Sequence, residues 1–183
     1  MADGHPPVGH DLSSHNRTDE EAVAMDVRFL DDAQQRVVAA IDAGVGRFRA
    51  PLDGGWSAEL VIAHVILTTE LLVRTTEQVL LGAPTWWDNA PTGMRANLAE
   101  VAKSCGDVCG LLDRYWFAAE ALTHVAAKLT PAQAARVVAV RVVSGGLVTI
   151  DQVSTPWGRA LRWHADVHLP EHVETLASLA ARG

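Results

Sequence analysis

Apolar residues recur every three or four positions in four long stretches of the chain, a period typical of helices that bury one face. The first stretch follows Thr18 and an acidic turn, and the second follows Ser57, a good N-cap residue. The last follows Thr155 and Pro156, which suit a cap and a first helical position. The predicted helices cover residues 18–44, 57–81, 94–129 and 155–181, with a bend in the third near Gly106 or Gly110.

A small β-hairpin is predicted between the third and last helices. Residues 137–143 (VVAVRVV) and 147–153 (LVTIDQV) are rich in β-branched side chains, which favour strands. Ser144, Gly145 and Gly146 lie between them and suit a tight turn. The expected fold class is therefore mainly α, a four-helix bundle with a hairpin before the last helix.

One globular domain is expected after a short tail. Residues 1–17 are rich in Gly, Pro, Ser and His and lack apolar periodicity, which predicts a mobile or disordered tail. Residues 18–183 form the predicted domain, since a chain of 183 residues with 49% hydrophobic content can bury one sizeable core.

Charge and cysteine content narrow the classes of partner and the compartment. With 15 basic and 22 acidic residues the net charge is -7, which opposes binding to nucleic acid and to anionic membranes. No apolar run is long enough to span a bilayer, and the N-terminus lacks the features of a secretory signal. Two cysteines, Cys105 and Cys109, are too few for a disulfide framework, and CGDVC is not a CxxC redox motif. A cytoplasmic protein is expected.

Three histidines on predicted buried faces stand out as candidate metal ligands. His64 shares an apolar stripe with Leu60 and Leu67 in the second helix, although a single such histidine is more often a hydrogen-bonded core residue. His164 and His168 lie one turn apart on the apolar face of the last helix. Two imidazoles at i and i+4 can converge on one ion, and a third from another helix completes an open site.

His172 extends the last-helix series and offers a competing pair with His168. Pro170 lies between them, and a proline inside a helix bends the axis, which is expected to turn His172 toward the rim. His124, near the end of the third helix, is interpreted as an ordinary exposed histidine. The predicted ligand set is therefore His64, His164 and His168.

Two segments resemble a known family. GWSAELVIAHVILTTELL and, a hundred residues later, WHADVHLPEHVETL are similar to the DinB-like (YfiT-like) metal-binding four-helix bundles, especially the N-terminal domain of mycothiol-dependent maleylpyruvate isomerase and related thiol S-transferases. The family's motif is one histidine on the second helix and an HxxxH pair on the last. The resemblance implies metal ligation by His64, His164 and His168, with mycothiol as a thiol cosubstrate.

An open three-histidine site predicts a divalent ion such as Zn²⁺ or Ni²⁺, which can lower the pKa of a bound thiol or water. The leading hypothesis is a metal-dependent enzyme that activates a low-molecular-weight thiol for S-transfer or isomerisation of a small-molecule substrate. A metal-dependent hydrolase and a non-catalytic metal-binding or stress-response bundle stay open. A homodimer is compatible with the sequence.

Four further residues flank the predicted site. Asp166 and Glu171 are candidates for bases or hydrogen-bond partners of the ligands, although charged residues at such positions usually form the solvated face of a helix. Trp86 and Trp87 are expected in a loop that either lines the mouth of a cleft or covers the end of the bundle.

Overall fold

A computed structural model describes residues 24–51, 54–144 and 147–181. This part of the chain is mainly helical and includes a three-stranded sheet. The predicted tail of residues 1–17 and the predicted turn at Gly145 and Gly146 lie outside the described residues. No described helix is both long and apolar enough to cross a membrane.

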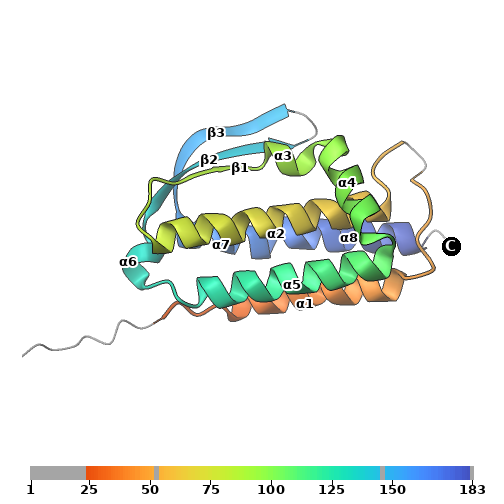
Figure 1. Ribbon diagram of the computed structural model, residues 1–183, viewed down its shortest axis with the longest axis horizontal. Coiled ribbons are helices and arrows are strands. Elements are labelled where there is room, and N and C mark those ends of the chain that lie inside the picture. The colour runs from red at the N-terminus through yellow and green to blue at the C-terminus, as the bar shows by residue number, and fades with distance from the viewer. Residues whose placement is uncertain (1–23, 52–53, 145–146, 182–183) are drawn as a thin grey trace, which may run out of the picture.

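Four long helical segments lie side by side (Figure 1). They are α1 (Arg28–Gly44), α2 (Ala58–Leu80), α5 (Val108–Ala126) and a continuous C-terminal segment made of α7 (Trp157–Trp163), η1 (His164–His168) and α8 (Leu169–Ala181). Both α1 and α2 pack against α5 on one side and against α8 on the other. The apolar stripes of all four therefore meet in one interior.

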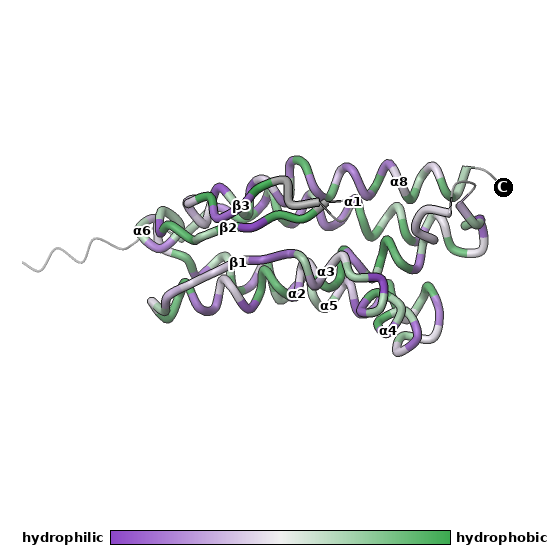
Figure 2. The backbone as a smooth tube through the Cα atoms, turned by 90° about the horizontal axis from the view of Figure 1, so that it is seen from above, coloured by the Kyte–Doolittle hydropathy of each residue, from purple (hydrophilic) through white to green (hydrophobic). Residues whose placement is uncertain are grey.

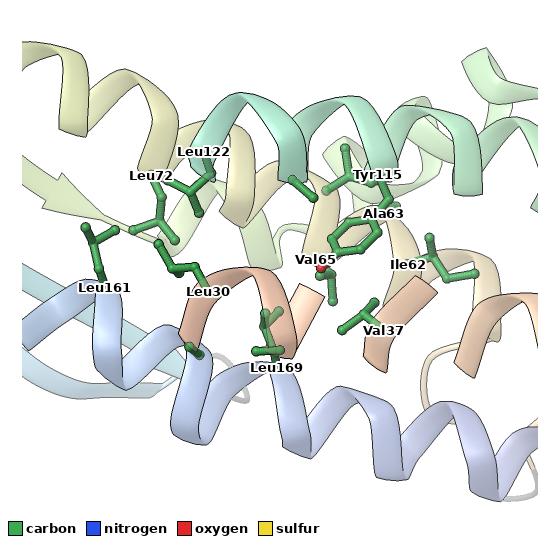
Figure 3. Close-up of a cluster of buried hydrophobic side chains, with 14 of the residues drawn as sticks. Leu30, Val37, Ile62, Ala63, Val65, Leu72, Tyr115, Leu122, Leu161 and Leu169 are labelled. Carbon is green, nitrogen blue, oxygen red and sulfur yellow. The ribbon is translucent and has the colours of Figure 1, made fainter. Parts of the chain in front are cut away.

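The core fills the space between these helices. Figure 3 shows side chains from the long helices pointing toward one another, and Leu30, Ile62, Leu72, Tyr115, Leu122 and Leu161 among them are fully buried or nearly so. Burying one such aliphatic side chain stabilises the fold by about 1.5–3 kcal/mol. This core fixes the spacing between α2 and the C-terminal segment, which carry the candidate site.

The first helix begins later than its sequence suggests. Residues 24–27 are not helical, and the Met25 N–H donates to the carbonyl of Leu129, 3.0 Å away. This bond holds the segment against the chain that leaves α5, so α1 begins at Arg28. The predicted start at Thr18 lies outside the described residues, and its continuation through residues 24–27 is wrong.

The predicted third helix is two helices, α4 (Arg95–Cys105) and α5, which point in different directions (Figure 1). Gly106 separates them with a φ of 84°, a left-handed conformation that glycine adopts without steric cost. Asp107 then caps α5 by accepting a hydrogen bond from the Gly110 N–H. The predicted bend at Gly106 is a complete break.

The sheet confirms the predicted strand pair and adds a third strand. β2 (Val137–Ser144) and β3 (Leu147–Pro156) are antiparallel, and β1 (Trp86–Asp88) pairs with β2 in parallel, with Trp86 opposite Ala139. The loop predicted around Trp86 and Trp87 is therefore wrong. A three-residue strand whose partner lies about fifty positions away leaves no local pattern in the sequence.

The sheet lies along one side of the helices (Figure 1), where β1 packs against α2 and β3 against α7. Figure 2 shows the same layer from above, with β1 along α2 and with β2 beside β3. The short helix α3 (Ala90–Gly93) follows β1, and α6 (Pro131–Ala134) precedes β2. Asn89, just before α3, holds β2 through two hydrogen bonds between its side-chain amide and the backbone of Val143. This link places α3 over the N-terminal half of α2.

Candidate metal centre

His64 is a buried residue of α2 whose ring is oriented by α3. Its Nδ1 lies 2.7 Å from the carbonyl oxygen of Thr92, and a carbonyl only accepts, so Nδ1 carries the proton. The lone pair of the neutral ring is then on Nε2. Metal-binding histidines are oriented in this way, with one nitrogen donating to a carbonyl and the other free for the ion.

His168, at the end of η1, and His172, on α8, face His64 across the interior. The ring centroids are 5.2 Å apart for His64 and His168, 4.9 Å for His64 and His172, and 4.6 Å for His168 and His172. One nitrogen from each ring lies within 4.8 Å of the others. We call these three residues the histidine cluster.

The histidine cluster has the donors that a divalent ion requires. Three neutral imidazoles suit Zn²⁺ or Ni²⁺, and Nε2 of His168 is buried with no hydrogen-bond partner in the described residues. No cysteine or carboxylate of the described part of the chain joins the cluster. Three protein ligands would leave one position for an exogenous molecule.

The structure corrects the expected role of Pro170. Instead of a kink after His168, the chain makes a π-helical turn from His164 to His168, closed by the Leu169 N–H donating to the His164 carbonyl. A π turn places one extra residue in the helix, and it precedes a proline that has no N–H to continue the α-helical pattern. His172 consequently faces inward instead of lying at the rim.

His164 is buried but is not part of the histidine cluster. Its ring centroid lies 5.0 Å from that of His168, and both of its nitrogens are buried without a partner. The extra residue of the π turn changes the rotation between positions 164 and 168, so an i, i+4 pair no longer points at one place. The structure brings together His64, His168 and His172, and it places the predicted ligand His164 beside them.

Burial keeps all four imidazoles neutral. It lowers the pKa of His164 and of His172 to about 3, with the neighbouring histidines adding to the effect. It also lowers the pKa of His168 well below 6.5, and that of His64, where the hydrogen bond to Thr92 opposes the shift. Neutral rings hold lone pairs ready for a metal without first losing a proton.

Aromatic rings pack on two of the three rings. Trp163 stacks on His168, with centroids 5.8 Å apart and planes 13° apart. Trp56 packs on His64 with centroids 5.2 Å apart. These contacts, together with the Thr92 carbonyl, limit the rotation of two rings of the histidine cluster.

The two predicted carboxylate partners lie away from the cluster. Asp166 is exposed and its nearest described basic partner is Arg162, 4.0 Å away. Glu171 is exposed beside a recess that also contains Trp56. The hydrogen-bond partner of the site is instead a backbone carbonyl, that of Thr92, which no side-chain motif could have revealed.

The other residues singled out from the sequence, two tryptophans, two cysteines and His124, differ in their exposure. Trp87 is buried, whereas Trp86 is exposed. Trp87 and His164 both line a cavity of about 300 Å³ between the sheet and α7. Cys105 is partly buried and Cys109 is exposed, and both are free thiols. His124 is exposed on α5, as expected.

No protein-family model, curated protein or solved structure matches this chain.

Proposed function

We propose that His64, His168 and His172 bind one divalent ion, Zn²⁺ or Ni²⁺, and that the protein uses it to activate a low-molecular-weight thiol of the mycothiol type. The observation that supports this most strongly is the convergence of three neutral imidazoles, two buried and one partly buried, from two helical segments that are far apart in the sequence. Without a shared ligand, such a cluster leaves desolvated polar atoms in the interior, which costs about 1–3 kcal/mol for each unpaired group.

We propose further that the four long helices form a DinB-like four-helix bundle. Support comes from their packing, each of α1 and α2 lying against both α5 and α8, and from the position of the histidines. One ligand lies on the second long helix and an HxxxH pair, His168 and His172, lies on the last. That pair is one turn later than the pair assigned from the sequence.

A metal ion bound there would lower the pKa of a thiol that reaches the open position, so that the thiolate predominates near neutral pH. The residues of the chain hold the site in place. Thr92 orients His64, Trp163 fixes the plane of His168, and the buried walls exclude water. Both cysteines lie outside the cluster, so the thiol would come from a separate molecule. Their free state agrees with a cytoplasmic location.

The proposal is tested by metal analysis followed by turnover. The protein is purified without a histidine tag, and its metal content is measured before and after loading with Zn²⁺ or Ni²⁺. Mycothiol and monobromobimane are then supplied, and the thiol sulfur displaces bromide while its proton goes to solvent. We expect turnover only in loaded protein, with loss in His172→Ala and retention in His124→Ala.

Other outcomes discriminate the alternatives. Hydrolysis of an ester such as p-nitrophenyl acetate, with no response to thiols, would favour a metal-dependent hydrolase. One tightly bound ion with neither activity would favour a non-catalytic metal-binding protein. Failure of the protein to retain Zn²⁺ or Ni²⁺ in a stoichiometric amount after loading would contradict the proposal.

A further inference from the structure

The cavity between the sheet and α7 is an apolar chamber next to the histidine cluster. Its walls come from β1, β2, β3, α2 and the C-terminal helix, and include Leu72, Trp87, Val140, Val142 and Trp163. At about 300 Å³ it matches the size of a one- or two-ring organic molecule. Apolar walls of this kind bind the hydrocarbon part of a ligand by excluding water from it.

The charge at the cavity is opposite to that of the protein. The chain carries 22 acidic residues and a net charge of -7, yet Arg159 is the one charged residue that lines the cavity among the described residues. Arg159 is exposed, and no carboxylate of the described residues forms an ion pair with it. A free guanidinium beside apolar walls favours a ligand with an apolar body and a carboxylate.

Apolar side chains also remain uncovered around the opening. Ile150 and Val153 on β3 are 37% and 50% exposed, and Trp163 is 38% exposed, although all three line the cavity. Exposed apolar groups gathered around a cavity with a single cation are typical of a binding site for an organic molecule.

Two buried side chains of the cavity have polar atoms with no hydrogen-bond partner among the described residues. Nε1 of Trp87 is a donor, and both nitrogens of His164 are unpaired, and all are shielded from solvent. Buried polar atoms are normally paired, so a group held inside the protein is expected to satisfy these atoms. His164 also lies between this cavity and the metal centre, since its ring is 5.0 Å from that of His168.

We propose that this cavity binds a small aromatic or aliphatic carboxylate, with its hydrocarbon part between the sheet and α7 and its carboxylate at Arg159. The identification of this molecule as the electrophilic substrate of the metal centre rests on the proposed function. The binding site itself depends only on the cavity and its charge.

The test is calorimetric titration of the full chain with 2-naphthoate, and with 2-naphthamide as its uncharged analogue. We expect saturable binding of one naphthoate and weaker binding of the amide. Arg159→Gln should weaken naphthoate about tenfold, equivalent to about 1.4 kcal/mol. The matched control is Arg162→Gln, three positions along the same helix, which removes an exposed arginine that does not line the cavity.

Absence of saturable binding, or equal affinities for naphthoate in the wild type and in Arg159→Gln, would overturn the proposal. Ala160→Leu, which adds three carbons at the cavity wall, provides a second variant and should also weaken binding. The same titration with His172→Ala separates this proposal from the metal proposal. Naphthoate should bind that variant unchanged, so the cavity stands even if the metal centre does not, and loss of binding there would contradict it.

Discussion

The imidazoles of His64 and His172 meet edge to face, with ring centroids 4.9 Å apart and planes at 66°. One ring comes from α2 and the other from α8, so the contact joins two helices that are far apart in the sequence. Among the described residues no carboxylate acts to favour protonation of either ring, and the pKa of each is lowered by burial. Their proximity is the feature of the structure that a metal ion would explain most simply.

Lowered histidine pKa values predict that the metal-free protein loses stability in acid. In the unfolded chain histidine titrates near 6.5, whereas the pKa values of His164 and His172 in the folded protein are about 3. Between these values the unfolded state binds more protons, so each buried histidine lowers the free energy of unfolding by about 1.4 kcal/mol per pH unit as pH falls. Urea unfolding at pH 7.5, 6 and 5 measures this.

In His172→Leu the free energy of unfolding should decline less steeply as pH falls, while His124→Gln should match the wild type. A free energy of unfolding that stays flat from pH 7.5 to 5 would show that the rings are not held neutral. Metal occupancy should also persist below pH 6.5, because protons compete less well for rings whose pKa values are lowered.

Substitution of Thr92 in α3 is expected to weaken metal binding even though no histidine of the cluster is removed. Its hydroxyl donates to the Asn89 carbonyl and accepts from Thr68, and these bonds place the carbonyl that orients His64. Thr92→Val keeps the shape and removes both bonds, so metal affinity should fall about tenfold, within the range for such supporting groups. Competition with a chromophoric chelator measures the affinity.

Thr69→Val is the matched control for that variant. Thr69 is equally buried on α2, but its hydroxyl bonds only within its own helix, to Val65. Metal affinity should be unchanged in this control. Equal losses in the two variants would mean that general destabilisation, and not the orientation of His64, sets the affinity.

Substitution of Tyr115 in the core is expected to stabilise the protein. Its hydroxyl is buried with no hydrogen-bond partner in the described residues, and burial raises its pKa. Tyr115→Phe removes the desolvated hydroxyl and should raise the free energy of unfolding by about 1 kcal/mol. Trp157→Phe should lower it, because the buried Trp157 Nε1–H donates to Thr76. Thermal and urea unfolding measure both, and destabilisation by Tyr115→Phe would reveal a hidden partner for the hydroxyl.

Local patterns in the sequence predict the long helices and the β2–β3 pair well. The apolar stripe that includes His64 is enough to bury that ring, and the β-branched runs on either side of residues 144–146 mark two adjacent strands. These features depend on residues within a few positions of one another. Apolar periodicity and capping residues are therefore enough to predict these elements from the sequence.

Features that depend on distant partners are not recovered from the pattern. Trp86–Asp88 is a strand because β2 lies beside it, and α1 begins at Arg28 because Met25 is bound to Leu129. The site illustrates the same limit. Pro170 indicates a disturbed helix, but whether the disturbance is a kink or a π turn depends on the packing around it, and that choice decides between His164 and His172.

Metal affinity in two single variants tests the histidine cluster most directly. Zn²⁺ dissociation constants are measured at pH 7.5 by competition with a chromophoric chelator for the wild type, His172→Ala and His164→Ala. We predict that His172→Ala weakens binding at least about 100-fold, since it removes one of three ligands, while His164→Ala stays within about threefold of the wild type. Full affinity in His172→Ala together with loss in His164→Ala would contradict the cluster and return the site to His64, His164 and His168.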